Sequence, residues 1–425
     1  MSSTPTDPGR SAARDERELR GALRLLHSAV FLASFDRLAI APLLLPIALD
    51  LGVPVEQVAV VATLYFVGYG ATQVLWGFAS DRLGRVRTVR IALALSVLAG
   101  LVSAVAPDVV VLAVARFVAG AAYAAVFPTA IIYIGDSLPP LRRHGPLADL
   151  MAVSAVGMAT ATLVAAGIAD LLGWRAAFAA PAVAAAGLVV LLRRVPEPAV
   201  EHPRQRPGAS LAAVLLRPWP VAVLLLVLVE GMVLVGVLTY LPALLQRAGM
   251  STTGSGLVTA GYGLAVMLAA PLVKRLAGAG MSATRRLATG GVLATAAYVA
   301  LLLDQAWVGV LAACVLLAAA WAFMHTTLQT WVTEVAPGAR ATAVSLFASG
   351  LFLGGAAWTA LGAAPFASGS FTRYLAAGAA LSAALGVAAT WLHRAYDRTP
   401  AVQGSARRAQ PCAAGGRCLS PARRR

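Results

Sequence analysis

Unbroken apolar runs of bilayer length constrain this chain more than any other feature of its sequence. Val58 to Ala79 spans 22 residues without a charged side chain, and Ile91 to Ala106 is a second uncharged run. The hydrocarbon layer of a membrane is about 30 Å thick, and about 20 residues of helix cross it. Only 12% of the residues are charged, whereas soluble domains have about twice that fraction. We therefore expect an all-α polytopic membrane protein and not a β-barrel, whose strands would alternate apolar and polar residues.

Twelve such runs are expected to form transmembrane helices. An even number places both termini on one side of the membrane, and cytoplasmic segments are enriched in Arg and Lys. With the termini inside, 29 of the 34 basic residues are cytoplasmic, and the outer loops hold only Arg175, Arg247 and Arg373. We therefore expect a multi-pass protein with both termini in the cytoplasm. The expected helices are 25–49, 58–79, 88–106, 109–134, 147–170, 175–194, 218–245, 255–273, 285–303, 306–332, 342–366 and 371–392.

The two sets of six helices repeat each other. Gly68-Tyr69-Gly70 matches Gly261-Tyr262-Gly263, and Leu45-Pro46 matches Leu241-Pro242. Ordered pairs of this kind indicate duplication of a six-helix unit. The chain is predicted to form two pseudo-symmetric bundles joined by a Pro-rich linker, with a basic, disordered end. The predicted parts are a cytoplasmic N-terminal tail (1–24), the first bundle (25–194), a cytoplasmic linker (195–217), the second bundle (218–393) and a basic cytoplasmic tail (394–425).

Composition and motifs argue against several other classes of protein. The net charge of +16 comes from 34 basic residues of which only Lys274 is Lys, a bias that fits a GC-rich bacterial genome better than a nucleic-acid-binding surface. Cys314, Cys412 and Cys418 have the spacing of neither a disulfide framework nor a zinc site. Lys274 follows Val273 and precedes Arg275, so the chain has no P-loop. No metal cluster, cofactor site or nucleophile–base pair is evident, and we do not expect an enzyme.

A densely charged loop separates the second and third expected helices. The loop contains two glycines, and because glycine has no Cβ the two helices and the turn between them can pack closely. Asp81 is the one acid among several Arg, and it can pair with Arg85 or face the positive N-terminus of a neighbouring helix. The residues that define this loop are Gly77, Asp81, Arg82, Gly84, Arg85 and Arg87.

This loop resembles the signature between helices two and three of the major facilitator superfamily. Arg116 to Gly120 and the turn Gly173-Trp174-Arg175 are similar to further motifs of that family. The resemblance covers about residues 25–395 and implies two six-helix bundles that work by alternating access. A Gly-Pro pair typical of helix five in antiporters is missing, and Lys274 replaces the Asp of the loop signature in the second half.

The resemblance also implies a gate. Asp81 would contact the start of helix eleven, near Ala341-Thr342, and would hold the cytoplasmic ends of the bundles together in the outward-facing state. A second layer of charges would support this contact; alternatively, all these charges serve only to set topology. The second layer consists of Asp136, Arg142, Glu334 and Arg340.

Charges inside the membrane mark candidate functional sites, because each costs roughly 2.5–3.5 kcal/mol at the bilayer centre. Asp36 and Glu230 are expected at similar depth in opposite halves, where each carboxylate could bind and release a proton. Arg37 lies beside Asp36, and Arg116 would pair with Asp36 when that acid is deprotonated. His325 could relay protons or contact substrate. A static pair of Asp36 with Arg37 or Arg116, and a structural role for His325, are the alternatives.

Three functions follow from these observations. The first is proton-coupled export of a small hydrophobic or drug-like molecule, because buried carboxylates lie in an apolar pathway. The second is import or facilitated passage of a metabolite. The third is a membrane sensor or scaffold that transports nothing, which only the long basic tail favours. The expected partners are a small-molecule substrate, protons and the lipid bilayer, with the chain acting as a monomer.

Overall fold

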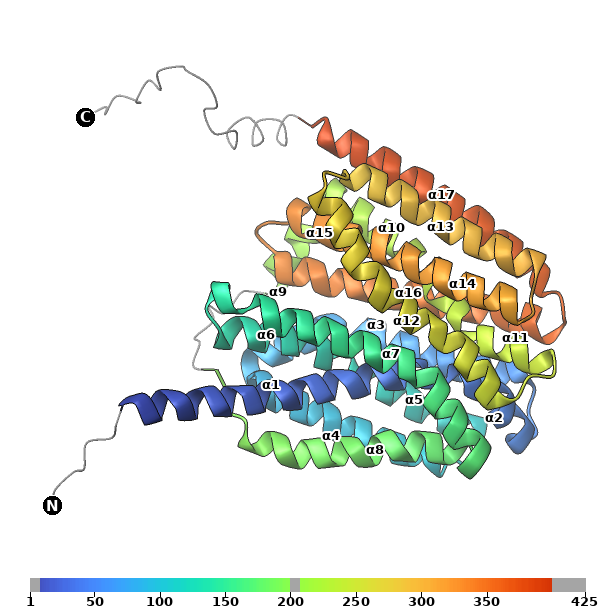
Figure 1. Ribbon diagram of the computed structural model, residues 1–425, viewed down its shortest axis with the longest axis horizontal. Coiled ribbons are helices and arrows are strands. Elements are labelled where there is room, and N and C mark those ends of the chain that lie inside the picture. The colour runs from blue at the N-terminus through green and yellow to red at the C-terminus, as the bar shows by residue number, and fades with distance from the viewer. Residues whose placement is uncertain (1–7, 199–206, 400–425) are drawn as a thin grey trace.

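A computed structural model describes residues 8–198 and 207–399 of the 425-residue chain. Every regular element in these ranges is helical, and twelve segments are long and apolar enough to cross a membrane, as predicted. The spans form two six-helix bundles that lie side by side (Figure 1). The spans are Glu16–Leu51, Val55–Leu83, Arg85–Ala104, Val109–Ser137, Pro140–Leu172, Trp174–Arg194, Pro218–Arg247, Thr252–Gly278, Ala283–Leu303, Trp307–Val335, Arg340–Ala367 and Phe371–Asp397.

The duplication is visible in the breaks within the helices. The first span consists of α1 (Pro8–Ala39), a 3₁₀ turn and α2 (Leu44–Leu51), and the seventh of α10 (Pro218–Leu234), a 3₁₀ turn and α11 (Leu241–Arg247). Both breaks lie just before the matched Leu-Pro sequences, and Pro42 lies within the first break. Proline removes a backbone donor and crowds the preceding turn. The fourth and tenth spans are also broken, the fourth into α5 (Val109–Tyr123) and α6 (Val126–Ser137).

The tenth span contains a π-helical turn. Its parts are α14 (Trp307–Ala320), the π turn Trp321–His325 and α15 (Thr326–Val335). Such turns insert one residue into the helical register and frequently occur at functional sites. Each remaining span contains one α-helix, and a 3₁₀ turn precedes the helix of the fifth span and follows that of the sixth. These helices are α3 (Val55–Leu83), α4 (Arg85–Ala104), α7 (His144–Leu172), α8 (Trp174–Leu191), α12 (Thr252–Gly278), α13 (Ala283–Leu303), α16 (Arg340–Ala367) and α17 (Phe371–Asp397).

Two helix pairs form the main contact between the bundles: α3 with α16, and α7 with α12. Glycine allows both approaches. A Cβ on Gly263 of α12 would lie 2.2 Å from Ala159 Cα of α7, and a Cβ on Gly70 of α3 would lie 2.9 Å from Leu353 Cγ of α16. The Gly-Tyr-Gly repeat noted in the sequence therefore places small residues at both contacts between the bundles.

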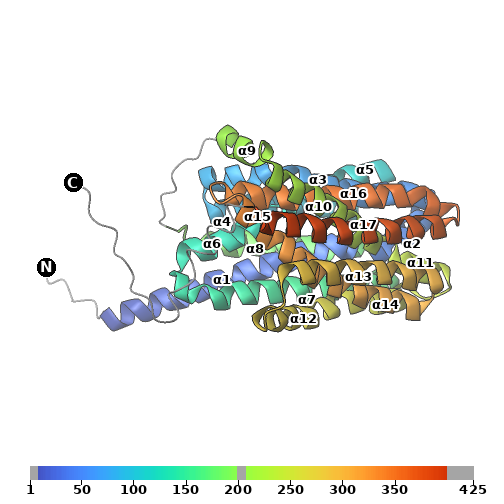
Figure 2. The same ribbon diagram turned by 90° about the horizontal axis from the view of Figure 1, so that it is seen from above.

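Two segments are more helical than expected. α1 begins at Pro8, well before the predicted start at residue 25, and extends beyond the other helices (Figure 2). Residues 8–24 are polar but rich in good helix formers, and Glu16 forms an (i, i+4) pair with Arg20. In the linker, Pro207 starts α9 (Pro207–Leu215), because proline is tolerated in the first turn of a helix.

Both described chain ends and the charged loop lie at one end of the molecule, which we name the basic end. The other end, where Gly52, Gly173, Gly249 and Gly369 make turns with positive φ, is named the opposite end. The predicted tail beyond residue 399, with Cys412 and Cys418, lies outside the described residues, as do residues 199–206 of the linker.

Candidate transport and gating sites

The first bundle contains a buried ion pair between its first and fourth spans. Arg116 of α5 donates from both terminal nitrogens to the two carboxylate oxygens of Asp36 of α1, at 3.1 Å for one of these bonds. The side chains of Arg116 and Asp36 are 0% and 4% exposed. The guanidinium lies 4.8 Å from the ring centroids of both Tyr65 and Phe178. The structure thus brings together two of the predicted site residues.

Arg37 faces away from this pair and toward the second bundle. Its guanidinium lies 5.5 Å from the ring centroid of Phe352 on α16, and Tyr69 and Tyr262 are within its electrostatic reach. It forms no ion pair with a described acid. The sequence-based alternative of an Asp36–Arg37 pair is therefore not realised, since Asp36 is occupied by Arg116.

The second bundle contains a different acid–base pair between its own first and fourth spans. Glu230 of α10 is fully buried, and its Oε2 lies 3.2 Å from His325 Nδ1. The imidazole stacks on Trp321 with a centroid distance of 3.8 Å and lies 5.3 Å from the ring of Phe347. The second oxygen of Glu230, Oε1, is buried and has no hydrogen-bond partner among the described residues.

The two pairs occupy equivalent spans but differ in chemistry. An Arg side chain stays charged under all ordinary conditions, and its fork matches a carboxylate with two hydrogen bonds. Glu230 and His325 are joined by a single contact at 3.2 Å, and Glu230 Oε1 has no hydrogen-bond partner among the described residues. The first pair is therefore held by two charge-assisted hydrogen bonds and the second by one.

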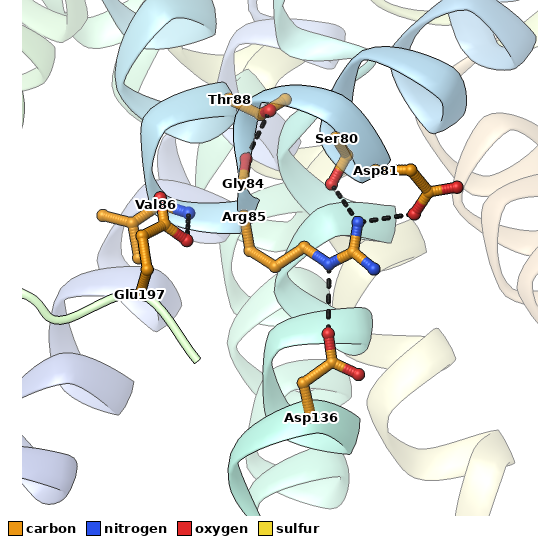
Figure 3. A network of polar contacts seen from close by, with 8 residues as sticks. All are labelled: Ser80, Asp81, Gly84, Arg85, Val86, Thr88, Asp136 and Glu197. Atoms are coloured by element: carbon orange, nitrogen blue, oxygen red, sulfur yellow. Dashed lines mark hydrogen bonds and ion pairs between the residues drawn. The ribbon is translucent and has the colours of Figure 1, made fainter. Parts of the chain in front are cut away.

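The charged loop forms a network centred on Arg85 (Figure 3). Arg85 donates to Asp81 Oδ1 at 2.6 Å, to Ser80 Oγ at 3.1 Å and to Asp136 Oδ2 at 3.0 Å. Gly84 joins α3 to α4 with φ of +94°, a conformation that side chains with a Cβ rarely adopt. Among the predicted gate residues, the structure brings together Asp81, Arg85 and Asp136.

Glu197 of the linker also contacts the charged loop, and it was not identified from the sequence. Its carboxylate accepts a hydrogen bond from the backbone N–H group of Val86 at 3.1 Å (Figure 3). It accepts a second from the backbone N–H group of Arg87 at 2.7 Å. It thereby satisfies two of the free donors at the start of α4. A Cβ at Gly84 would lie 2.8 Å from Glu197 Cδ, so Gly84 also makes room for this contact. The sequence signal was an isolated acid between Pro196 and Pro198.

Of the second layer of the predicted gate, Asp136 joins the Arg85 network. Arg142 lies 3.9 Å from Glu16 on the extended α1, while Glu334 and Arg340 are exposed. The remaining loop residues, Arg82 and Arg87, are also exposed.

The expected contact of Asp81 with the start of helix eleven is absent in this conformation. The Asp81 side chain is 56% exposed and, in the part of the chain described, bonds only to Arg85. The two helices are nevertheless neighbours, because a Cβ on Gly77 of α3 would lie 3.6 Å from Ser345 Oγ of α16.

Hydrogen bonds between the two bundles lie toward the opposite end. Asp170 of α7 accepts from both the backbone N–H and the hydroxyl of Thr253, at 2.8 and 2.6 Å, at the first turn of α12. Gln246 donates to the carbonyl of Pro42 at 2.8 Å. Thr162 donates to the carbonyl of Gly256 at 3.0 Å. Together these hydrogen bonds join the two bundles at the opposite end.

Two duplicated bundles, each with a buried ionisable pair between its first and fourth spans, form an arrangement that is found in secondary transporters. The family model described as Major Facilitator Superfamily matches residues 26–359. The chain belongs to that family. No group of three His, Cys, Asp or Glu side chains able to hold a metal occurs among the described residues.

Several curated proteins resemble the chain over part of its length. A "Triacylglyceride transporter" of Mycobacteroides abscessus is 28% identical over 225 residues, which cover 51% of this chain and 43% of that protein. One of Mycolicibacterium hassiacum is 32% identical over 157 residues, covering 36% and 29%. The chain therefore matches less than half the length of these curated relatives.

Solved transporter structures share the fold. The crystal structure of the peptide transporter POT in complex with sulfate superimposes with a TM-score of 0.72 at 15% identity, covering 86% of this chain and 93% of that one. A bacterial homolog of the human lysosomal transporter Spinster gives a TM-score of 0.71 at 16% identity, covering 92% and 99%.

Proposed function

We propose that this transporter is a proton-coupled exporter of a small hydrophobic or drug-like molecule. It would act as a monomer by alternating access in a bacterial cytoplasmic membrane, with the basic end and both termini in the cytoplasm. The strong excess of Arg at that end supports this orientation. A hydrophobic substrate is supported by the partial relatives named as triacylglyceride transporters.

One observation carries the proton coupling: Glu230 is fully buried, shares one oxygen with His325 and leaves the other without a hydrogen-bond partner. A buried carboxylate whose acceptors are unsatisfied is costly, and a proton on Oε1 removes its charge. In the proposed cycle, Glu230 and His325 take up a proton when the pathway between the bundles is open to one side of the membrane. They release it when the pathway is open to the other side.

Asp36 and Arg116 have a different role in this proposal. Sequence alone suggested both acids as proton sites, but the two-bond contact with Arg116 favours a permanently ionised Asp36. The pair would fix the position of α1 against α5. Arg37, the next residue of α1, would then face the substrate pathway between the bundles, which the aromatic rings of Phe352 and Tyr69 would also line.

The Arg85 network would be the gate at the basic end. The opposite end is closed by Asp170–Thr253 and Gln246–Pro42, and alternating access requires that the ends close in turn. In the state that is closed at the basic end and open at the opposite end, α3 and α16 would have shifted relative to each other. The exposed Asp81 would then reach the N-terminal turn of α16, whose N–H groups favour an anion. Glu334 and Arg340 would approach the first bundle in the same movement.

Efflux from cells tests the proposal. Cells that lack their own efflux pumps would express the wild type, Glu230→Gln or the matched control Asp149→Asn, which changes an exposed carboxylate to an amide. A panel of hydrophobic dyes and drugs would be scored for retention with and without a proton uncoupler.

We expect uncoupler-sensitive efflux in the wild type and the control, and its loss in Glu230→Gln. Uptake of labelled metabolites with no efflux would instead indicate an importer. Uncoupler-sensitive efflux that persists in Glu230→Gln would refute proton coupling at this site.

A further inference from the structure

A cavity at the basic end lies outside the transport pathway. It has a volume of about 540 Å³ and lies between the first turns of α4 and the last turns of α8, closed on one side by the linker. Arg87 and Arg90 of α4 and Glu197 of the linker form its polar part. Figure 1 shows α4 and α8 side by side at the edge of the first bundle.

The polar part of the cavity has an excess of positive charge. Both oxygens of Glu197 already accept backbone N–H groups of α4. Neither Arg87 nor Arg90 forms an ion pair with an acid in the described ranges, and Arg90 Nε is buried without a hydrogen-bond partner. A buried guanidinium donor without an acceptor is unfavourable, so the cavity is suited to an anion with several oxygens.

The rest of the cavity is apolar and continues toward the lipid-facing surface. Ile91 and Ala94 line it on α4, one to two turns beyond Arg87, and Val189 lines it on α8. Farther along the same helices, Leu98 is 63% exposed and Val183 is 65% exposed. Exposed apolar side chains on a membrane-spanning bundle face lipid, so the apolar wall leads from the charged end into the hydrocarbon layer.

We propose that this cavity binds one anionic phospholipid. Its phosphate would accept hydrogen bonds from Arg87 and Arg90, since guanidinium groups bind phosphate oxygens with charge-assisted bonds. The upper part of one acyl chain would lie along Ile91, Ala94 and Val189. Basic pockets between transmembrane helices on the cytoplasmic side are a recognised form of lipid site. The bound lipid would also brace the start of α4, which presents Arg85 to Asp81 and Asp136.

Native mass spectrometry of the detergent-purified protein tests this site without any transport measurement. Phosphatidylglycerol, phosphatidylcholine or inorganic phosphate would be added to the wild type, to Arg87→Gln/Arg90→Gln and to the control Lys274→Gln/Arg275→Gln. The control removes two exposed cations at the basic end of α12. We expect phosphatidylglycerol to remain bound to the wild type and the control, and to bind about thirtyfold more weakly to Arg87→Gln/Arg90→Gln.

A third variant separates a built site from diffuse attraction to the protein surface. Ala94→Phe fills the apolar part and leaves both Arg in place, so it should also lose phosphatidylglycerol; its thermal unfolding would verify the fold. Equal weakening in the Lys274→Gln/Arg275→Gln control would overturn the proposal. Equal affinity for phosphatidylcholine and phosphatidylglycerol would also overturn it. A third contrary result would be inorganic phosphate that stays bound in Ala94→Phe and that phosphatidylglycerol displaces only poorly.

Discussion

Replacing Arg116 by Met is expected to destabilise the protein strongly while leaving the apolar packing nearly unchanged. Met preserves much of the side-chain volume against Tyr65 and Phe178, whose rings lie 4.8 Å from the guanidinium. Asp36, 3% exposed, then loses both of its hydrogen bonds to Arg116. Removing one partner of a buried ion pair costs about 3–5 kcal/mol, because a charge remains buried without a counter-ion.

The second substitution, Asp36→Asn, identifies the source of this cost. In the Arg116→Met background it removes the stranded charge and should restore about 2 kcal/mol, leaving the ~1–3 kcal/mol expected for unsatisfied buried polar groups. Thermal unfolding of the purified protein, followed by tryptophan fluorescence, would rank the wild type, both single variants and the double variant. If the double variant were as unstable as the sum of the single changes, Asp36 and Arg116 would not be energetically coupled and the pair could not position α1.

Three further perturbations follow from the same contacts. Glu197→Gln weakens the acceptors at the start of α4 and should lower stability by about 1 kcal/mol, as loss of a helix cap does; an unchanged unfolding midpoint would show that the linker contact is incidental. Asp170→Ala removes the cap that α7 provides to α12, so spin-label distances across the opposite end should lengthen; distances equal to those of the wild type would contradict its role as a clamp. Asp81→Asn should slow conformational cycling more than it weakens substrate binding, whereas Lys274→Ala should do neither; equal losses in single-turnover transport would assign the loop to membrane topology alone.

The fold could be predicted because its determinants are local. Apolar runs specify membrane-spanning helices, and matched pairs such as Leu45-Pro46 and Leu241-Pro242 recur at the same place in each half. The start of α1 at Pro8 was missed because hydropathy detects only the apolar part of a helix. Residues 8–24 form helix through propensity and an (i, i+4) ion pair, which leave no apolar signal.

The candidate sites were predictable where partners lie close in the chain or where intramembrane charge is rare. Arg85 and Asp81 are four residues apart, on either side of the turn at Gly84. The contact of Glu230 with His325 joins residues 95 positions apart. His325 also lies in a π turn, which no sequence pattern predicted. Asp170 and Glu197 cap helices from distant segments, and such capping is visible only once the helices are placed. The second gate layer was expected from the family resemblance, and in the proposed cycle its assembly depends on which end of the molecule is open.

Infrared difference spectroscopy tests the central claim most directly, because it observes protonation of a buried carboxylic acid without knowledge of the substrate. The reconstituted wild type would be shifted between acidic and alkaline buffer while the C=O stretching band of protonated carboxyl groups is recorded. Exposed carboxylates also become protonated on acidification, so the contribution of Glu230 is measured as the difference between variants. We expect the band that appears on acidification to be smaller in Glu230→Gln than in the wild type, and unchanged in Asp36→Asn. A band that is unchanged in Glu230→Gln and smaller in Asp36→Asn would contradict the proposal, since the proton would then reside on the acid held by Arg116.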